Sequence, residues 1–137
     1  MARVEVRDEI DAPREVVWDL VSDFGGVKRI SPEVESCVLD GQGVGAVRTI
    51  NTQGIVIKER LESLDGKNYT FSYSIVEGPI PFTNYLAQVE LSPDGDRTKV
   101  NWSGSFEPVG VPEDTLKQLV ETIYRNLIGG IKKAVAK

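Results

Sequence analysis

The chain has 137 residues, of which 40% are apolar and 27% charged, and its formal net charge is −5. The length predicts one domain, residues 1–137, with enough chain to bury a core. The acidic balance argues against nucleic acid as a partner, because binding to phosphates requires a basic face. The absence of histidine excludes Ser-His-Asp and Cys-His catalysis, and the single cysteine, Cys37, excludes an internal disulfide.

The composition also leads to expectations about the cellular location of the protein, its cofactors and its oligomeric state. A stretch of about 18 apolar residues is missing, so we expect no stable insertion into membranes. The charged, alternating start MARVEVRDEI is unlike a signal peptide, and the lone cysteine fits the reducing cytoplasm. We expect no metal and no other cofactor, since histidine is the commonest metal ligand. We also expect a monomer or a weak homodimer.

The N-terminal segment combines a strand with a short helix. Residues 2–10 alternate between apolar and polar side chains, which predicts a strand. A helix follows from about Pro13, which suits a first helical turn, and the glycines at 25–26 end it. The apolar positions of this helix are Val16, Val17, Leu20 and Val21.

Six short strands are predicted in the middle of the chain. Turn signals separate them, the clearest being Gln53-Gly54 and the DGD motif at 94–96. Alternation and an enrichment in Tyr, Phe, Thr and Ile favour strands over helices here. The predicted ranges are 34–39, 46–52, 54–64, 68–77, 84–93 and 97–108.

A long amphipathic helix is predicted after Pro112, because apolar residues recur there at spacings of three and four. Gly129 and Gly130 lie inside it at a cost of about 1 kcal/mol each relative to alanine, which a kink or close packing would explain. The order of elements predicts an α+β fold, in which a curved antiparallel sheet of about seven strands wraps around this helix. The apolar positions are Leu116, Leu119, Val120, Ile123, Leu127, Ile131 and Val135.

A charged pair is predicted inside this fold. If Gln53-Gly54 forms a two-residue turn, Arg48 lies directly opposite Glu59, whereas a turn at Thr52-Gln53 places them diagonally on the same face. Glu59 shares that face with apolar residues, so we expect the two side chains to pair in a partly apolar interior, since a lone buried carboxylate is costly. The alternative is that both side chains lie at a solvated end of the sheet.

The predicted inner faces of the other strands are large and aromatic, but they include phenols, an indole and small residues. Apolar walls with a few convergent polar groups are typical of a ligand cavity. Tyrosines also occur in plain cores, with their hydroxyls satisfied at the rim. The composition therefore leaves a cavity and a filled core equally open. These faces comprise Tyr69, Phe71, Tyr73, Ile75 and Glu77, then Tyr85, Ala87, Val89 and Leu91, then Val100, Trp102, Gly104 and Phe106.

Several stretches, in order along nearly the whole chain, resemble the START-like or helix-grip superfamily, also called SRPBCC. They are IDAPREVVWDLVSDFGG, VESCVLDGQGVGAVRTI, ERLESLD, YSIVEGPIPFTNYLAQVEL and VNWSGSFEP. That superfamily includes polyketide cyclases/dehydrases, the birch-pollen-allergen family and the plant abscisic-acid receptors. The resemblance implies a deep cavity between the sheet and the long helix for hydrophobic or amphipathic small molecules, and it is specific for the fold rather than the activity.

The resemblance also implies roles for single residues. The apolar GPIPF stretch matches the loop that closes the cavity mouth in the hormone receptors, so Ile80 and Phe82 are expected in a lid or rim; a rigid loop that caps the core is the alternative. It further implies that Glu59, Tyr85 and Ala87 line the pocket. From the long helix, it implies the same role for Leu119, Ile123 and Leu127.

This sequence also departs from those receptors. The lysine that holds their ligand's carboxylate is missing near Ser31, and their SGLPA gate loop is replaced by the tight turn NTQG, so hormone perception through that gate is unsupported. The complete set of expected ligand-binding residues is Arg48, Ile50, Ile57, Glu59, Leu61, Tyr73, Ile75, Ile80, Phe82, Tyr85, Ala87, Trp102, Leu119, Ile123 and Leu127.

Three functions remain open at this point. The leading hypothesis is binding of a small hydrophobic or amphipathic, lipid- or polyketide-like ligand, with Arg48 facing a ligand carboxylate or phenolate. The alternative is a polyketide cyclase, aromatase or dehydratase, with Glu59 as the base and Tyr85 or Tyr73 as the acid. A further alternative is a protein-interaction module, which an exposed apolar patch of Ile80 and Phe82 would favour.

Overall fold

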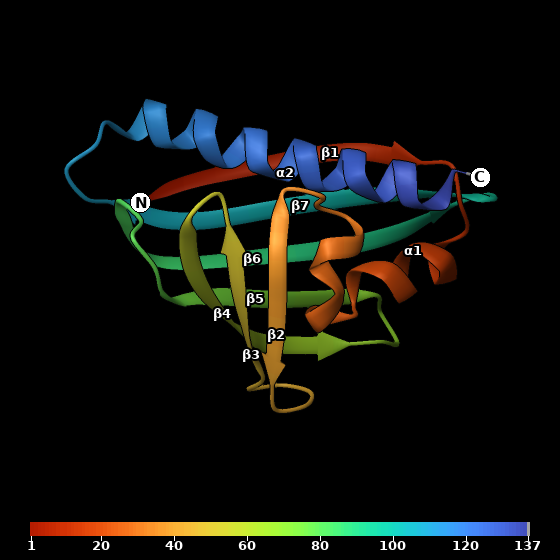
Figure 1. Cartoon of the computed structure of the whole chain (residues 1–137). Helices are drawn as coiled ribbons and strands as arrows, with labels where there is room; N and C mark the ends of the chain where they lie inside the picture. The colour runs from red at the N-terminus through yellow and green to blue at the C-terminus, as the bar shows by residue number, and fades with distance from the viewer. Residues whose placement is uncertain (137) are drawn as a thin grey trace.

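The computed structural model describes residues 1–136 as a seven-stranded antiparallel sheet that curves around a long C-terminal helix (Figure 1). The strands pair in the order β1-β7-β6-β5-β4-β3-β2, and this arrangement confirms the expected α+β helix-grip fold. The elements are β1 (Ala2–Ile10), α1 (Arg14–Val21), the 3-10 helix η1 (Phe24–Arg29), β2 (Val34–Asp40), β3 (Val47–Thr52), β4 (Ile55–Asp65), β5 (Thr70–Glu77), β6 (Phe82–Asp94), β7 (Arg97–Pro108) and α2 (Glu113–Val135).

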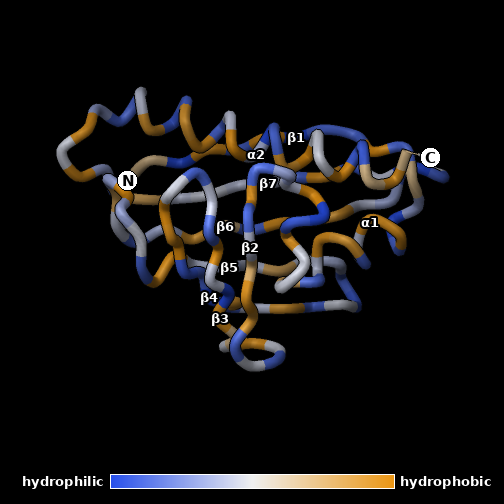
Figure 2. Tube along the Cα trace, in the orientation of Figure 1, coloured by the Kyte–Doolittle hydropathy of each residue, from blue (hydrophilic) through white to orange (hydrophobic). Residues whose placement is uncertain are grey.

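The long helix α2 buries one stripe of side chains against the sheet. Its apolar positions turn towards the sheet and its polar positions turn away (Figure 2). Acidic residues in its first turn and lysines in its last turn complement the helix dipole. The buried stripe consists of Leu116, Val120, Tyr124, Ile128 and Ile131. Within residues 1–136, no helix is both long and apolar enough to cross a membrane.

The two adjacent glycines of α2 have different surroundings. A Cβ atom at Gly130 would overlap the carbonyl oxygen of Ile30, which follows η1, whereas a Cβ atom at Gly129 would meet open space. Close packing therefore explains Gly130, because only glycine lets α2 approach the end of η1 this closely.

The short helices α1 and η1 lie on the same side of the sheet as α2 (Figure 1). They bury Val17 and Val21 of α1 and Phe24 and Val27 of η1 in the core that the inner face of the sheet also forms. The interior is thus enclosed by the sheet, by α2 and by this α1–η1 segment.

The strand boundaries differ from expectation mainly around β5 and β6. β5 begins at Thr70 because Tyr69 has a positive φ of 57°, which an extended strand does not allow. β6 begins at Phe82, so the connection between these strands is short, and Phe82 is a buried strand residue instead of a loop residue.

Candidate functional site

Arg48 and Glu59 face each other across the β3–β4 hairpin, as a two-residue turn at Gln53-Gly54 predicts. Gln53 and Gly54 both have positive φ angles, 50° and 81°, as a tight two-residue turn requires, and the register places Arg48 opposite Glu59. The Arg48 side chain donates from Nε to Oε1 of Glu59 at 2.8 Å, and its Nη2 lies 2.6 Å from the same oxygen. The two side chains are only 8% and 12% exposed, so the interior pair is confirmed.

Arg48 also connects the sheet to η1. Its Nη1 donates to the carbonyl oxygen of Phe24 at 3.1 Å. Its guanidinium carbon lies 4.0 Å from the ring centre of Phe24 and 5.0 Å from that of Tyr73. The guanidinium is therefore held by a carboxylate, a carbonyl and two aromatic faces, which is how a buried arginine is usually accommodated.

Next to this pair lies a group that we call the phenol cluster: Tyr73, Tyr85, Tyr124 and Trp102. The hydroxyls of Tyr85 and Tyr124 lie 2.5 Å apart, and Nε1 of Trp102 donates to the hydroxyl of Tyr73 at 3.2 Å. Tyr73, Tyr85 and Trp102 come from β5, β6 and β7, and Tyr124 comes from α2. All four residues are buried, so the cluster bridges the sheet and the helix at the centre of the molecule.

Gly104 makes room for this cluster. A Cβ atom at position 104 would overlap the hydroxyl of Tyr124. A side chain here would therefore push Tyr124 away from the sheet, and glycine is needed for the close approach of α2 to β7.

Burial raises the pKa of all three phenols in the cluster. Desolvation is the largest cause in each case, and the negative charge of Glu59 adds to the rise. The hydroxyls of Tyr73, Tyr85 and Tyr124 therefore stay protonated at neutral pH, and each keeps a hydrogen to donate.

The cluster has more polar hydrogens than hydrogen bonds among its own members. Each of the four side chains carries one polar hydrogen. Trp102 uses its hydrogen on Tyr73, and one hydroxyl of the Tyr85–Tyr124 pair uses its own on the other. These two bonds use two of the four hydrogens, and one further bond between the two pairs would use a third, so among residues 1–136 at least one buried hydroxyl hydrogen of the cluster has no acceptor.

The space beside the cluster is small. A hollow of about 10 Å³ lies between the sheet, α2 and the α1–η1 segment, which is about the room that one water molecule needs. Aromatic packing fills the neighbouring volume: the ring centres of Phe82 lie 5.4 Å from Tyr85 and 5.0 Å from Phe106. The expected deep cavity is therefore a filled core in this structure, because Phe82, Tyr85 and Tyr124 occupy its centre.

The structure brings most of the expected ligand-binding residues into the interior. Those that are buried are Arg48, Ile50, Leu61, Tyr73, Phe82, Tyr85, Ala87 and Trp102. Those that are partly buried are Ile57, Glu59, Ile75, Ile80 and Leu127. Ile80 belongs to the short connection before β6, whereas Phe82 packs in the core and is not part of an exposed lid.

Two helix residues were assigned to the wrong face. Leu119 and Ile123 are 48% and 45% exposed, so they do not line the interior. Each precedes a residue of the buried stripe, Val120 or Tyr124, and one residue turns an α-helix by about 100°. Tyr124 is the residue that sequence reasoning missed, although its spacing of four from Val120 was a visible signal.

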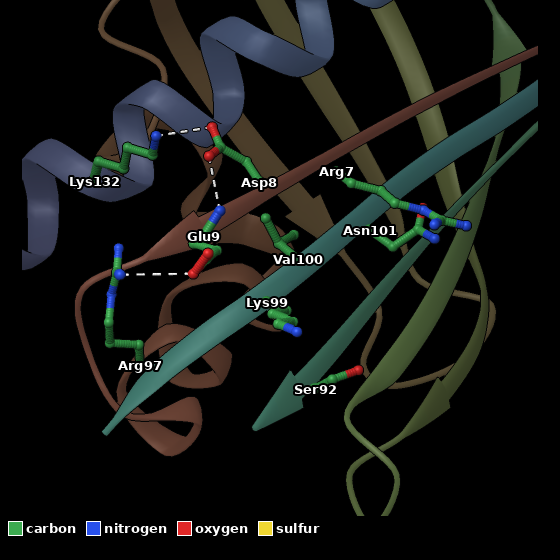
Figure 3. Close-up of a pocket in the computed structure, with 9 residues that line it drawn as sticks. All are labelled: Arg7, Asp8, Glu9, Ser92, Arg97, Lys99, Val100, Asn101 and Lys132. Atoms are coloured by element: carbon green, nitrogen blue, oxygen red, sulfur yellow. Dashed lines mark hydrogen bonds and ion pairs between the residues drawn. The ribbon is translucent and has the colours of Figure 1, made fainter. Parts of the chain in front are cut away.

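A second, larger hollow lies on the surface and has a different chemistry (Figure 3). It measures about 690 Å³, and Arg7, Asp8, Glu9, Ser92, Arg97, Lys99, Val100, Asn101 and Lys132 line it. Lys132 pairs with Asp8 at 2.8 Å and Arg97 with Glu9 at 3.6 Å, as the dashed lines show. Much of its charge is compensated by these ion pairs, which is typical of a solvated surface.

A family model described as "Polyketide cyclase / dehydrase and lipid transport" matches residues 1–136. The chain belongs to this family. Among solved structures, it is similar to the protein XoxI from Bacillus cereus, with 31% identity, a TM-score of 0.90, and coverage of 98% of this chain and 95% of that one. An uncharacterised protein from Bacillus thuringiensis gives 31% identity and a TM-score of 0.90, with coverage of 99% of this chain and 100% of that one.

Curated relatives of this family member include plant receptors. The chain is 30% identical over 134 residues to the abscisic acid receptor PYL6 from Arabidopsis thaliana, which covers 88% of this chain and 62% of the receptor. It is 28% identical over 90 residues to the receptor PYL7 from the same plant, which covers 62% of this chain and 43% of the receptor. The chain therefore spans about half the length of these receptors.

Proposed function

We propose that this protein binds a small, mainly apolar molecule that carries a hydrogen-bond acceptor, in the interior between the sheet and α2. The observation that carries the proposal is the phenol cluster, in which at least one buried hydroxyl hydrogen has no acceptor among residues 1–136. A buried donor without a partner is costly, and a ligand carbonyl, ether or hydroxyl oxygen removes that cost. The lipid-transport part of the family description and the ligand-binding relatives point the same way.

The apolar walls of the interior and its polar groups have different roles in binding. The aromatic and aliphatic side chains of the inner faces supply most of the affinity, at about 25 cal/mol per Å² of apolar surface buried. The phenol cluster and Arg48 orient the ligand through hydrogen bonds. Because the interior is filled, binding requires the walls to move apart, and the ligand takes the place of side-chain contacts.

Two fluorescent probes of similar size test this proposal: prodan, a naphthalene that carries a ketone oxygen, and N-phenylnaphthylamine, which lacks one. The triple variant Tyr73→Phe/Tyr85→Phe/Tyr124→Phe keeps the rings and removes every phenolic donor. We expect it to bind prodan about tenfold more weakly, which corresponds to one hydrogen bond of about 1.4 kcal/mol, and to bind the ketone-free probe as the wild type does.

Tyr69→Phe is the matched control, because Tyr69 lies outside the phenol cluster and packs against Trp18 and Arg14. It should bind both probes like the wild type. If the wild type binds neither probe, the proposal is overturned. If the wild type and the triple variant bind prodan with equal affinity, the phenol cluster does not contribute to ligand binding.

A second candidate function is a cyclase or dehydratase reaction on a polyketide-like substrate. Neutral phenols near the carboxylate of Glu59 favour it, because a buried hydroxyl stabilises the oxygen of an enolate by donating to it. Mass spectrometry of a synthetic poly-β-ketone incubated with the protein tests this idea. Loss of one water mass per substrate, absent with the triple variant, would support the reaction, and an unchanged substrate would rule it out for that compound.

A further inference from the structure

The α1–η1 segment forms the outer wall of the interior hollow. Leu20 and Val21 at the end of α1, together with Asp23, Val27 and Ile30, line the hollow from one side. Arg48, Phe71 and Trp102 of the sheet line it from the other side, and Leu127 of α2 completes it. Removing this segment would therefore expose Arg48 and Trp102, which line the opposite wall of the hollow.

This wall is also irregular. η1 is a 3-10 helix, whose hydrogen-bond geometry is poorer than that of an α-helix, and Gly26 inside it has non-helical angles of φ −101° and ψ 21°. Phe24 connects it to the centre of the site, through its carbonyl oxygen, which accepts from Nη1 of Arg48, and through its ring, which packs against Arg48 and Tyr73.

The other segments around the interior are fastened differently. The β3–β4 connection is a tight turn of Gln53 and Gly54, which offers no long loop to open. The β5–β6 connection contains two prolines, and the amide of Val109 donates to the carbonyl oxygen of Pro81 at 2.9 Å, which ties it to the end of β7.

We infer that the α1–η1 segment, residues 14–30, is the entrance through which the ligand reaches the interior, and that Arg48 fastens it. This inference rests on the proposed function. An acceptor oxygen on the ligand competes with the carbonyl of Phe24 for the guanidinium of Arg48, so ligand binding and release of η1 are coupled. Uptake then requires opening first, so its rate levels off as the probe concentration rises.

A reversible disulfide tests the entrance. A Cβ atom at Gly25 would lie 3.1 Å from Cβ of Leu39 on β2, close to the separation of about 3.5–4.5 Å found in disulfides. The variant Gly25→Cys/Leu39→Cys locks η1 to the sheet, with Cys37→Ser to prevent mispairing. The matched control is Ser63→Cys/Ser72→Cys in the same background, which links register partners on β4 and β5 and leaves η1 unlinked.

Prodan uptake is followed by stopped-flow fluorescence before and after reduction. We expect the oxidised lock to slow uptake at least tenfold, reductant to restore it, and the control to be unaffected by either treatment. Equal rates in the oxidised and reduced lock would overturn the entrance and leave the proposed function intact. Absence of uptake in every form, the wild type included, would overturn the proposed function and this inference with it.

Hydrogen exchange of the wild type provides a test that needs no substitution. The amides of Gly26, Ile30 and Ser31 bond within η1 and its end, and those of Ile80 and Val109 bond in and near the β5–β6 connection. We expect the η1 amides to exchange at least tenfold faster. Slower exchange in η1 than in the β5–β6 connection would contradict the assignment of the entrance.

Discussion

The Arg48–Glu59 pair and the phenol cluster lie in the same interior, yet their polar groups are satisfied to different degrees. The guanidinium of Arg48 has a carboxylate, a carbonyl oxygen and two aromatic faces as partners. The phenol cluster contains more hydrogens than its own oxygens accept. The compensated pair therefore contributes to the fold as it stands, whereas the cluster is completed only by an acceptor from outside. Substitutions in the two regions should separate these roles.

The largest expected effect comes from breaking the pair. Glu59→Gln removes the charge that compensates the buried guanidinium, and loss of one partner of a buried pair costs about 3–5 kcal/mol. Urea unfolding measures this loss. The control Glu121→Gln breaks the exposed pair with Arg125 and should cost about 0.5 kcal/mol or less. Equal effects of the two substitutions would show that Arg48 is not desolvated.

The next effect concerns the close approach of α2 to the sheet. Gly104→Ala places a methyl group on the hydroxyl of Tyr124, and overpacking of this kind costs about 1–3 kcal/mol. Tyr124→Phe removes the hydroxyl, so the double variant should recover part of the loss in the unfolding free energy. If the two changes in unfolding free energy simply add, position 104 and the hydroxyl of Tyr124 are not in contact.

A smaller effect, per residue, is expected from pH. Since the folded phenols have pKa values above the unfolded value of about 10, they stay neutral while the unfolded chain loses protons. Their contribution to stability is complete below pH about 10 and declines above it, by about 1.4 kcal/mol per pH unit and phenol. Unfolding measured from pH 9 to 11 should show a shallower decline for Tyr124→Phe than for the wild type. If the unfolding free energy declines equally steeply with pH in both proteins, the Tyr124 hydroxyl is exposed to solvent.

The fold and the charged pair could be predicted because they depend on local rules. Alternation places side chains on one face of a strand, and a two-residue turn fixes which residues lie opposite, so Arg48 and Glu59 follow from Gln53-Gly54 alone. The faces of β6 and β7 were predicted correctly for the same reason.

The centre of the site could not be predicted in the same way. Whether the interior is hollow depends on contacts between residues far apart in the chain, such as the hydroxyl of Tyr124 over Gly104. The choice between neighbouring helix stripes depends on how α2 is rotated against the sheet, which left Leu119 and Ile123 on the wrong face and Tyr124 unrecognised.

The central claim is that the interior donates a hydrogen bond to an acceptor oxygen of the ligand. The infrared carbonyl stretch of bound prodan tests it most directly, because this frequency falls when the carbonyl oxygen accepts a hydrogen bond. We predict a lower frequency in the wild type than in Tyr73→Phe/Tyr85→Phe/Tyr124→Phe. The same frequency in both proteins would mean that the phenol cluster does not contact the ligand, and it would contradict the claim.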